Sequence, residues 1–436
     1  MYILFPIEIY SREIAFKIQL GYLFAKKNYI VIIAEQRKCR DIAVELGNKC
    51  IFIGKHFFLA NDHNYDLAIR PLVEANVNIV FFDEEGLTFS SEESEIFEWC
   101  NKRLPTNLLP KDSILLHWGK AQRDITRKKN KDFTNYVIGV PAFDAIKNIA
   151  KNNVNNISEM DVLLSINVRG LSPPSSHNNI YDTIFERING LYSDRMNLRD
   201  LKSEISDEIS LLYAYWQLER NNVRVTLRSH PAQSVKNYYS SNAIDKFSSY
   251  LTEDIITSLN RHDVLFHTGC TTAIQAHFLG KKTIGLTSAR DNWELSNIYI
   301  DDLSCEPEED LYLNYKKVKS KSKISHFTPH GQEMIDNHDM STSSYNKILD
   351  IILNHFPPVS NSYTTHVALC QRIANKKTFK NLISKKLYTM KSIKYTKEFQ
   401  ITKNDIETNL IAAGYIASDT VKFKLFGCDI LVIHPN

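Results

Sequence analysis

The feature that most constrains the fold is a repeated alternation of short apolar runs with segments of helical periodicity. Residues 2–7, 29–34 and 50–54 are apolar runs, and apolar residues at helical spacing follow the first two of them. Uninterrupted apolar runs of this length are typical of strands buried on both faces, which occur in parallel sheets. The pattern continues to residue 139 and predicts a first doubly wound α/β domain. Its further strands are expected at 78–82, 113–118 and 136–139.

A second series of the same kind follows an Asn-rich polar segment, 147–159, which we expect to be a hinge. The predicted class is therefore α/β, with two Rossmann-type doubly wound parallel sheets facing a cleft. This is the architecture of GT-B glycosyltransferases, and by that analogy the first domain offers catalytic groups and the second binds the donor. The expected domains are an acceptor and catalytic domain at 1–150, a nucleotide-sugar donor domain at 151–355, and a basic, partly helical extension at 356–436. The second series has strands at 161–167, 224–227, 263–266 and 283–286, and helices at 205–221, 252–260 and 271–279.

Bulk properties exclude several classes of protein. Fifty-three basic and 50 acidic residues leave a net charge of +3, which argues against a nucleic-acid binder because such proteins need a concentrated basic surface. The seven cysteines are scattered without a CxxC pair, as expected for a reduced cytoplasmic protein. The first residues have no basic region and are expected to form a strand, not a signal peptide. No apolar run is long enough to span a membrane.

The C-terminal lysines and a group of three histidines can each be interpreted either as ordinary surface or as a specific site. The lysines between Lys376 and Lys397 are either solvated surface or a peripheral contact with the anionic inner membrane. The spacing of His326, His330 and His338 lacks the carboxylate or Cys pattern of a zinc site, so no metal is expected.

Residues 262–280 contain the first candidate for chemistry. An apolar strand runs into a small polar turn, 267–272, that opens a helix. Backbone N–H groups and hydroxyls at a helix N-terminus form an anion site. A simple helix cap remains the alternative, because Ser and Thr are general N-cap residues. The expected donor-binding residues of the turn are His267, Thr268, Gly269, Thr271 and Thr272.

Further polar residues follow two other strands of the second series. The strand at 224–227 ends on Arg228, with His230 two residues later, and the strand at 161–167 ends on Asn167, close to Arg169. Arg guanidinium groups pair well with phosphate and carboxylate oxygens. Because carboxyl ends of parallel strands share one edge, these residues predict a phosphate site there.

Three consecutive carboxylates end the strand at 78–82 in the first series. Asp83, Glu84 and Glu85 would face the ligand crevice of an open α/β sheet, where one of them would act as a base or a nucleophile. An acidic turn before a helix is the equal alternative. Glu8 follows the first strand at the same edge, and a carboxylate favoured by a helix dipole is its plain interpretation. Trp118 follows another strand and would either stack on a sugar or lie in the core.

Several pieces of the sequence, in order, resemble one family. The chain is similar to bacterial surface carbohydrate biosynthesis proteins, GT-B-like enzymes allied to transferases that use CMP-activated ulosonic acids. The similarity spans roughly residues 1–290, with Ser229 and Gln275 as departures where the family has Pro and Glu. The matching residues are 4–9, 11–13, 83–87, Trp118, Gly119, Gln122, Gly139, Pro141, Phe143, Asp144, Arg228, His230, Pro231, His267, 270–272 and Ala276.

The resemblance implies transfer of a Kdo, sialic-type or pseudaminic-type acid from its CMP conjugate to a capsule or lipopolysaccharide glycan. The acceptor would be lipid-linked, and no cofactor or metal is implied. Thr271, Thr272 and His230 would hold the CMP phosphate, and Arg12 or Arg169 the sugar carboxylate. The remaining implied contacts are Gln275 to the donor and Arg12, Trp118 and Gln122 to the acceptor or sugar.

Two other functions remain open from the sequence. One is a CDP-polyol phosphotransferase of the teichoic-acid type, which also uses His-Pro strand ends. The other is a non-catalytic partner in glycan assembly, which fits the basic C-terminal region.

Overall fold

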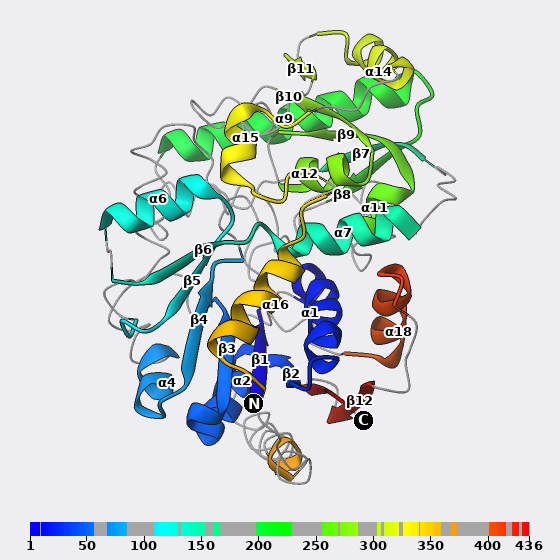
Figure 1. Cartoon of the computed structure of the whole chain (residues 1–436). Helices are drawn as coiled ribbons and strands as arrows, with labels where there is room; N and C mark the ends of the chain where they lie inside the picture. Colours follow the sequence, from blue (N-terminus) through cyan, green and yellow to red (C-terminus); the bar gives the residue numbers. More distant parts are fainter. Residues whose placement is uncertain are drawn as a thin grey trace, which may run out of the picture. The chain divides into compact units, whose positions relative to one another are not determined.

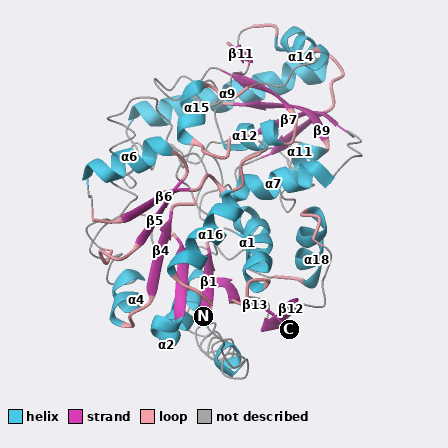
Figure 2. Ribbon diagram, in the orientation of Figure 1, coloured by secondary structure: helices cyan, strands magenta, loops and turns pink. Residues whose placement is uncertain are grey.

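The computed structural model of the chain contains, in the residues it describes, a sheet of eight strands and a sheet of five (Figures 1 and 2). The chain divides into two units. Unit 1 comprises Met1–Thr88, Glu93–Asn152 and Glu333–Asn436, and unit 2 comprises Phe89–Glu92 and Asn153–Gln332. The structure describes residues 1–8, 10–55, 68–84, 109–129, 132–152, 160–165, 198–228, 255–268, 271–286, 303–306, 309–321, 326–339, 341–358, 368–372, 401–415, 421–426 and 430–435.

The sheet of unit 1 is parallel apart from its C-terminal edge. Its strand order is β12-β13-β2-β1-β3-β4-β5-β6. Strands β1 to β5 are almost entirely apolar because helices cover both faces of the sheet there, whereas β6 and β12 carry exposed polar side chains. Their bounds are β1 Tyr2–Ile7, β2 Ile30–Glu35, β3 Cys50–Gly54, β4 Asn78–Phe82, β5 Ile114–His117, β6 Thr134–Val137, β12 Val421–Phe426 and β13 Ile430–Pro435.

Two groups of helices cover this sheet. Helix α1 packs against α7, α16 and α18, and its Gly21 lies against Val31 and Ile433 of the sheet. Helices α2 and α4 pack together over the other face, where Ile42 and Leu72 join the core. The helices of unit 1 are α1 Tyr10–Ala25, α2 Gln36–Leu46, the 3₁₀ turn η1 Gly47–Lys49, α4 Arg70–Glu74, α6 Lys120–Lys129, α7 Pro141–Asn152, α16 Ser344–His355 and α18 Lys403–Ala412; α15 Pro329–Met334 crosses the boundary.

The C-terminal strands extend the sheet of unit 1. Strand β13 pairs antiparallel with β2, and β12 pairs antiparallel with β13. Neither strand is among the expected elements, although β12 alternates exposed Lys422 with more buried neighbours as a half-buried strand does. The basic segment between Lys376 and Lys397 lies outside the described residues. Its membrane contact therefore stays a prediction.

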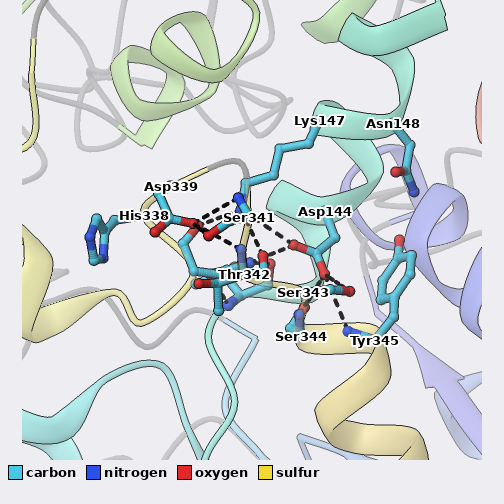
Figure 3. Close-up of polar contacts among 12 residues, drawn as sticks. Asp144, Lys147, Asn148, His338, Asp339, Ser341, Thr342, Ser343, Ser344 and Tyr345 are labelled. Carbon is cyan, nitrogen blue, oxygen red and sulfur yellow. Dashed lines mark hydrogen bonds and ion pairs between the residues drawn. The ribbon is translucent and has the colours of Figure 1, made fainter.

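Buried polar side chains of α7 bind the segment that leads into α16 (Figure 3). The Asp144 carboxylate accepts bonds from the backbone N–H of Ser344 at 2.6 Å and of Tyr345 at 3.2 Å, so it caps the start of α16 from another helix. Lys147 donates to the carbonyl of Asn337 at 2.5 Å. The expected hinge at 147–159 is therefore wrong for its first residues, because α7 continues to Asn152; residues 153–159 lie outside the described chain.

Unit 2 repeats the same plan. Its parallel sheet has the order β11-β10-β9-β7-β8, and α9 and α14 pack on one face through Leu211, Leu218 and Tyr315. The strands are β7 Met160–Ser165, β8 Val225–Arg228, β9 His262–His267, β10 Lys282–Leu286 and β11 Leu303–Cys305. The helices are α9 Leu198–Arg220, α11 Ile255–Asn260, α12 Thr271–Phe278 and α14 Leu311–Ser320.

The predicted fold class, α/β with two doubly wound parallel sheets, is confirmed. Numbered within each unit, the parallel strands follow the order 2-1-3-4-5-6 in unit 1 and 2-1-3-4-5 in unit 2, so the winding direction reverses once in each sheet. The reversal lies between β1 and β3 in unit 1 and between β7 and β9 in unit 2. The cleft expected between the two sheets stays a prediction, as do the expected domain boundaries.

Candidate functional sites

The carboxyl ends of β1 and β3 form the switch point of unit 1, where ligands bind in open α/β sheets. Glu8 directly follows β1 and Lys55 directly follows β3. The Glu8 carboxylate lies 2.5 Å from the Lys55 ammonium, and the Lys55 side chain is only 6% exposed. An ion pair therefore bridges the two strands where the winding reverses. Lys55 is not among the residues that the sequence pointed to.

A second set of charged residues lies at the same edge and is almost fully buried. Lys17 of α1 donates to the Glu13 carboxylate at 2.7 Å and lies 2.9 Å from the Glu84 carboxylate. It also donates to the carbonyl of Pro6. The side chains of Lys17, Glu13 and Glu84 are 0%, 7% and 9% exposed. We call these three residues the carboxyl–lysine triad.

Burial and charge together set the protonation of this triad. Burial raises the pKa of Glu84 well above its usual range, the Glu13 carboxyl raises it further, and Lys17 opposes both. Burial alone would lower the pKa of Lys17, but the two carboxyls outweigh it and raise that pKa. The raised pKa of Glu84 favours its protonated form beside the Lys17 ammonium. The catalytic role predicted for Glu84 stays a prediction.

Trp118 joins the end of β5 to the end of β4, and Gln122 holds the Trp118 backbone. The Trp118 indole donates to the Asp83 carbonyl at 2.7 Å, and its backbone N–H donates to the Gln122 side chain at 2.8 Å. Trp118 is 4% exposed and meets the edge of Phe143. These contacts place Trp118 in the core, one of the two positions expected for it. The sugar contacts predicted for Trp118 and Gln122 stay predictions.

The switch point of unit 2 aligns three polar residues in one row. The backbone register pairs Ser165 of β7 with Arg228 of β8 on one side and with His267 of β9 on the other. Their preceding neighbours Leu164 and Phe266 belong to the core under α9 and α14. Because side chains alternate along a strand, Ser165, Arg228 and His267 point to the opposite face.

A hydrogen bond holds the Arg228 side chain of this row, and its other two side chains are buried. The Arg228 guanidinium donates to the Ser258 hydroxyl on α11 at 2.8 Å, while Ser165 and His267 are 7% and 0% exposed. Thr268 follows β9 and is also buried, and α12 begins three residues later at Thr271. A cation, hydroxyls and a helix N-terminus at one edge suit an anion.

The other predicted residues fall into three groups. Thr271, Thr272 and Gln275 lie on the first turns of α12 and are half-buried, and Asp83 is half-buried at the end of β4. Arg12 lies on α1, where its side chain is not described. The predicted residues outside the described chain are Glu85, Asn167, Arg169, His230 and Gly269.

Within the described ranges, no group of three or more His, Cys, Asp and Glu side chains is placed to hold a metal ion. No helix in the described part of the chain combines the length and apolar character that a membrane span requires.

The sequence does not predict five residues of these two edges: Glu13, Lys17, Lys55, Ser165 and Ser258. Glu13 and Lys17 carry a usable signal, because opposite charges four residues apart form a pair on a helix that directly follows a strand. Ser258 has no such signal, since only the tertiary packing of α11 brings it to Arg228.

Neither a protein-family model nor a curated protein matches the sequence. Among solved structures, the chain is similar to UDP-GlcNAc 2-epimerase of Methanocaldococcus jannaschii, with 12% identity, a TM-score of 0.47, and 81% of this chain and 99% of that chain covered. It is similar to UDP-N-acetylglucosamine 2-epimerase of Rickettsia bellii, with 11% identity, a TM-score of 0.40, and 81% of this chain and 95% of that chain covered. It is also similar to Anabaena Alr3699/HepE, solved with UDP and glucose, with 12% identity, a TM-score of 0.35, and 88% of this chain and 100% of that chain covered. These values do not identify a family for the chain.

Proposed function

We propose that this protein is a glycosyltransferase that uses a nucleotide-activated sugar, specifically the CMP conjugate of a Kdo, sialic-type or pseudaminic-type acid. The observation that supports it most is the row of Arg228, Ser165 and His267 at the switch point of unit 2. A CMP-sugar carries a single phosphate, and a row of one guanidinium and neighbouring hydroxyl and imidazole groups matches one phosphate in size and charge.

Donor binding is assigned to this row and to the first turn of α12. Arg228 would pair with the phosphate while Ser258 holds its guanidinium in place. The backbone N–H groups that open α12, with Thr271 and Thr272, would add hydrogen bonds and the positive end of the helix dipole. These groups would also stabilise the charge that builds up on CMP as it leaves, without requiring a metal.

Proton removal from the acceptor is assigned to unit 1. In the reaction an acceptor hydroxyl oxygen bonds to the anomeric carbon, the bond from that carbon to the phosphate oxygen breaks, and CMP leaves with its electron pair. The acceptor proton needs a base. Asp83 suits this role because it is half-buried at the carboxyl end of β4. Glu8 is the second choice, since its carboxylate already engages Lys55 at 2.5 Å.

Release of CMP from purified protein tests the proposal. CMP-Kdo, CMP-sialic acid and CMP-pseudaminic acid are each incubated with the protein and a lipid-linked glycan acceptor, and free CMP and glycosylated product are quantified. CMP release with an acceptor-dependent product is expected for one donor. Absence of CMP release and of CMP binding would contradict the proposal.

A phosphorus NMR spectrum of the product separates the alternative phosphotransferase. Transfer of a ulosonic acid leaves no new phosphorus signal in the product, whereas transfer of polyol phosphate from a CDP conjugate adds one. Binding of assembly proteins without any nucleotide-dependent stabilisation would favour the non-catalytic alternative.

A further inference from the structure

The carboxyl–lysine triad joins the two segments of unit 1 that carry Glu8 and the half-buried Asp83. Glu13 accepts a hydrogen bond from the backbone N–H of Glu8 at 3.1 Å, which fixes the turn between β1 and α1. Glu84 directly follows Asp83 at the end of β4 and is bound to Lys17 at 2.9 Å. Every side chain of the triad is at least nine-tenths buried, so its geometry is set inside the protein.

Charge counting shows how the triad is balanced. Two ionised carboxylates around one ammonium would leave a net negative charge in a buried site, which is costly. A proton held on one carboxyl removes that charge and supplies a donor for the other carboxylate. Gly54 packs closely against this site. Its φ is +151°, and a Cβ there would lie 3.3 Å from a Glu84 oxygen and 2.9 Å from Pro6.

We propose that Glu84 is the proton-holding member of this triad and that the triad is a positioning element for Asp83 and Glu8. Glu84 donates its proton to Glu13 and accepts from Lys17, so the ends of β1 and β4 are joined through one hydrogen-bonded group. Glu84 acts through Asp83 and does not itself exchange a proton with substrate. The positioning part of this inference rests on the proposed function, while the proton-holding part does not.

The charged groups around Glu84 come from several elements. Glu13 and Lys17 face it from α1, and Asp83 precedes it on the chain. Glu8, paired with Lys55, lies at the end of β1. Cys39 of α2 is close enough to Lys17 to feel its charge, but burial raises the pKa of this thiol well above its usual range, and it stays neutral.

The protonation of Glu84 is measured directly on the full chain by NMR of ¹³C-carboxyl-labelled glutamate. We expect one resonance of a protonated carboxyl that persists from pH 5 to pH 8, is lost in Glu84→Gln, and is kept in the control Glu74→Gln, which changes an exposed residue of α4. A Glu84 carboxyl that is ionised at pH 6 would overturn the proposal.

The pH dependence of thermal unfolding gives a second readout. Because the pKa of Glu84 is raised in the folded state, the unfolded chain releases this proton above pH 4.5 while the folded chain keeps it, and stability falls as pH rises. Glu84→Gln copies the neutral form and lacks this loss. The Tm difference between Glu84→Gln and the natural chain should therefore grow from pH 5 to pH 8. Parallel curves would contradict a held proton.

Kinetics then separate positioning from catalysis. Glu84→Ala should lower kcat at least 10-fold with little change in KM for the CMP-sugar, and Glu84→Gln should restore most of the lost kcat. If Glu84→Gln is as inactive as Asp83→Asn, Glu84 exchanges the proton itself and the positioning role is wrong. If the natural protein uses no CMP-sugar, the proposed function fails, while the NMR and unfolding measurements still decide whether Glu84 holds a proton.

Discussion

The two switch points of the molecule share a backbone plan and differ in chemistry. Both sheets reverse their winding between the first and third strands of their unit. In unit 1 this edge holds the Glu8–Lys55 pair and, next to it, a triad with two further carboxyls. In unit 2 the equivalent edge holds Arg228, Ser165 and His267. The same topology thus presents an edge rich in carboxyls in one unit and, in the other, the edge that we propose binds an anion.

This difference matches the needs of a group transfer. A base must be negatively charged or neutral, and a phosphate needs cations and N–H donors, so the two functions are easier to build on separate sheets. The comparison predicts that substitutions at the acidic edge change the rate of the chemical step. Substitutions at the anion-binding edge should change the affinity for the donor.

Asp83→Asn should have the largest effect. Removing a general base lowers kcat by about 100- to 10,000-fold while donor affinity stays unchanged. The matched control is Asp112→Asn, which changes an exposed Asp before β5 at the other end of the same sheet. The measurement is steady-state CMP release with a parallel calorimetric titration of CMP. Equal activity in the two variants would remove Asp83 from the mechanism.

Lys17→Met should strongly destabilise unit 1. It leaves two buried carboxyls without their ammonium, and breaking a buried ion pair costs about 3–5 kcal/mol. Lys26→Met, an exposed residue just after the same helix, should change stability by about 0.5 kcal/mol or less. Denaturant unfolding measures both. A small loss in Lys17→Met would show that the triad does not hold the acidic edge together.

Arg228→Ala should weaken CMP binding about 10- to 100-fold, the usual loss for a charged hydrogen bond. Arg224→Ala is its control, because Arg224 stands just before the same strand, at its amino end, where it pairs with Asp161 at 3.2 Å. Calorimetric titration of CMP gives both affinities, and kcat should change less than affinity. Equal losses in the two variants would mean that the carboxyl edge of β8 is not the binding edge.

The smallest effect concerns His117, at the end of β5. Burial lowers the pKa of His117 to about 4, so between pH 6.5 and pH 4 the unfolded chain binds a proton that the folded chain does not. Stability should fall on acidification by at most about 1.4 kcal/mol per pH unit from this group. Unfolding of His117→Gln should be less sensitive to pH in this window than that of His355→Gln, which changes an exposed His. Identical pH dependence would contradict a buried neutral imidazole.

The sequence predicts the strands and the polar edges more completely than the contacts between them. Apolar runs predict β1, β3 and β4, and Glu8 and Asp83 are predicted because they directly follow two of these runs. Periodicity and strand ends are local properties of a sequence. The bond from Lys17 to Glu84 joins residues 67 positions apart, and no local pattern carries it. The pairing of β13 with β2 is likewise non-local. Arg228 was found, but its Ser258 partner depends on packing.

Crystallisation of the protein with CMP tests the central claim most directly. We expect electron density for the CMP phosphate at the carboxyl edge of β7, β8 and β9, within hydrogen-bonding distance of the Arg228 guanidinium and of the N–H groups that open α12. Density for the phosphate at the Glu8–Lys55 edge of unit 1, with the edge of unit 2 empty, would contradict it.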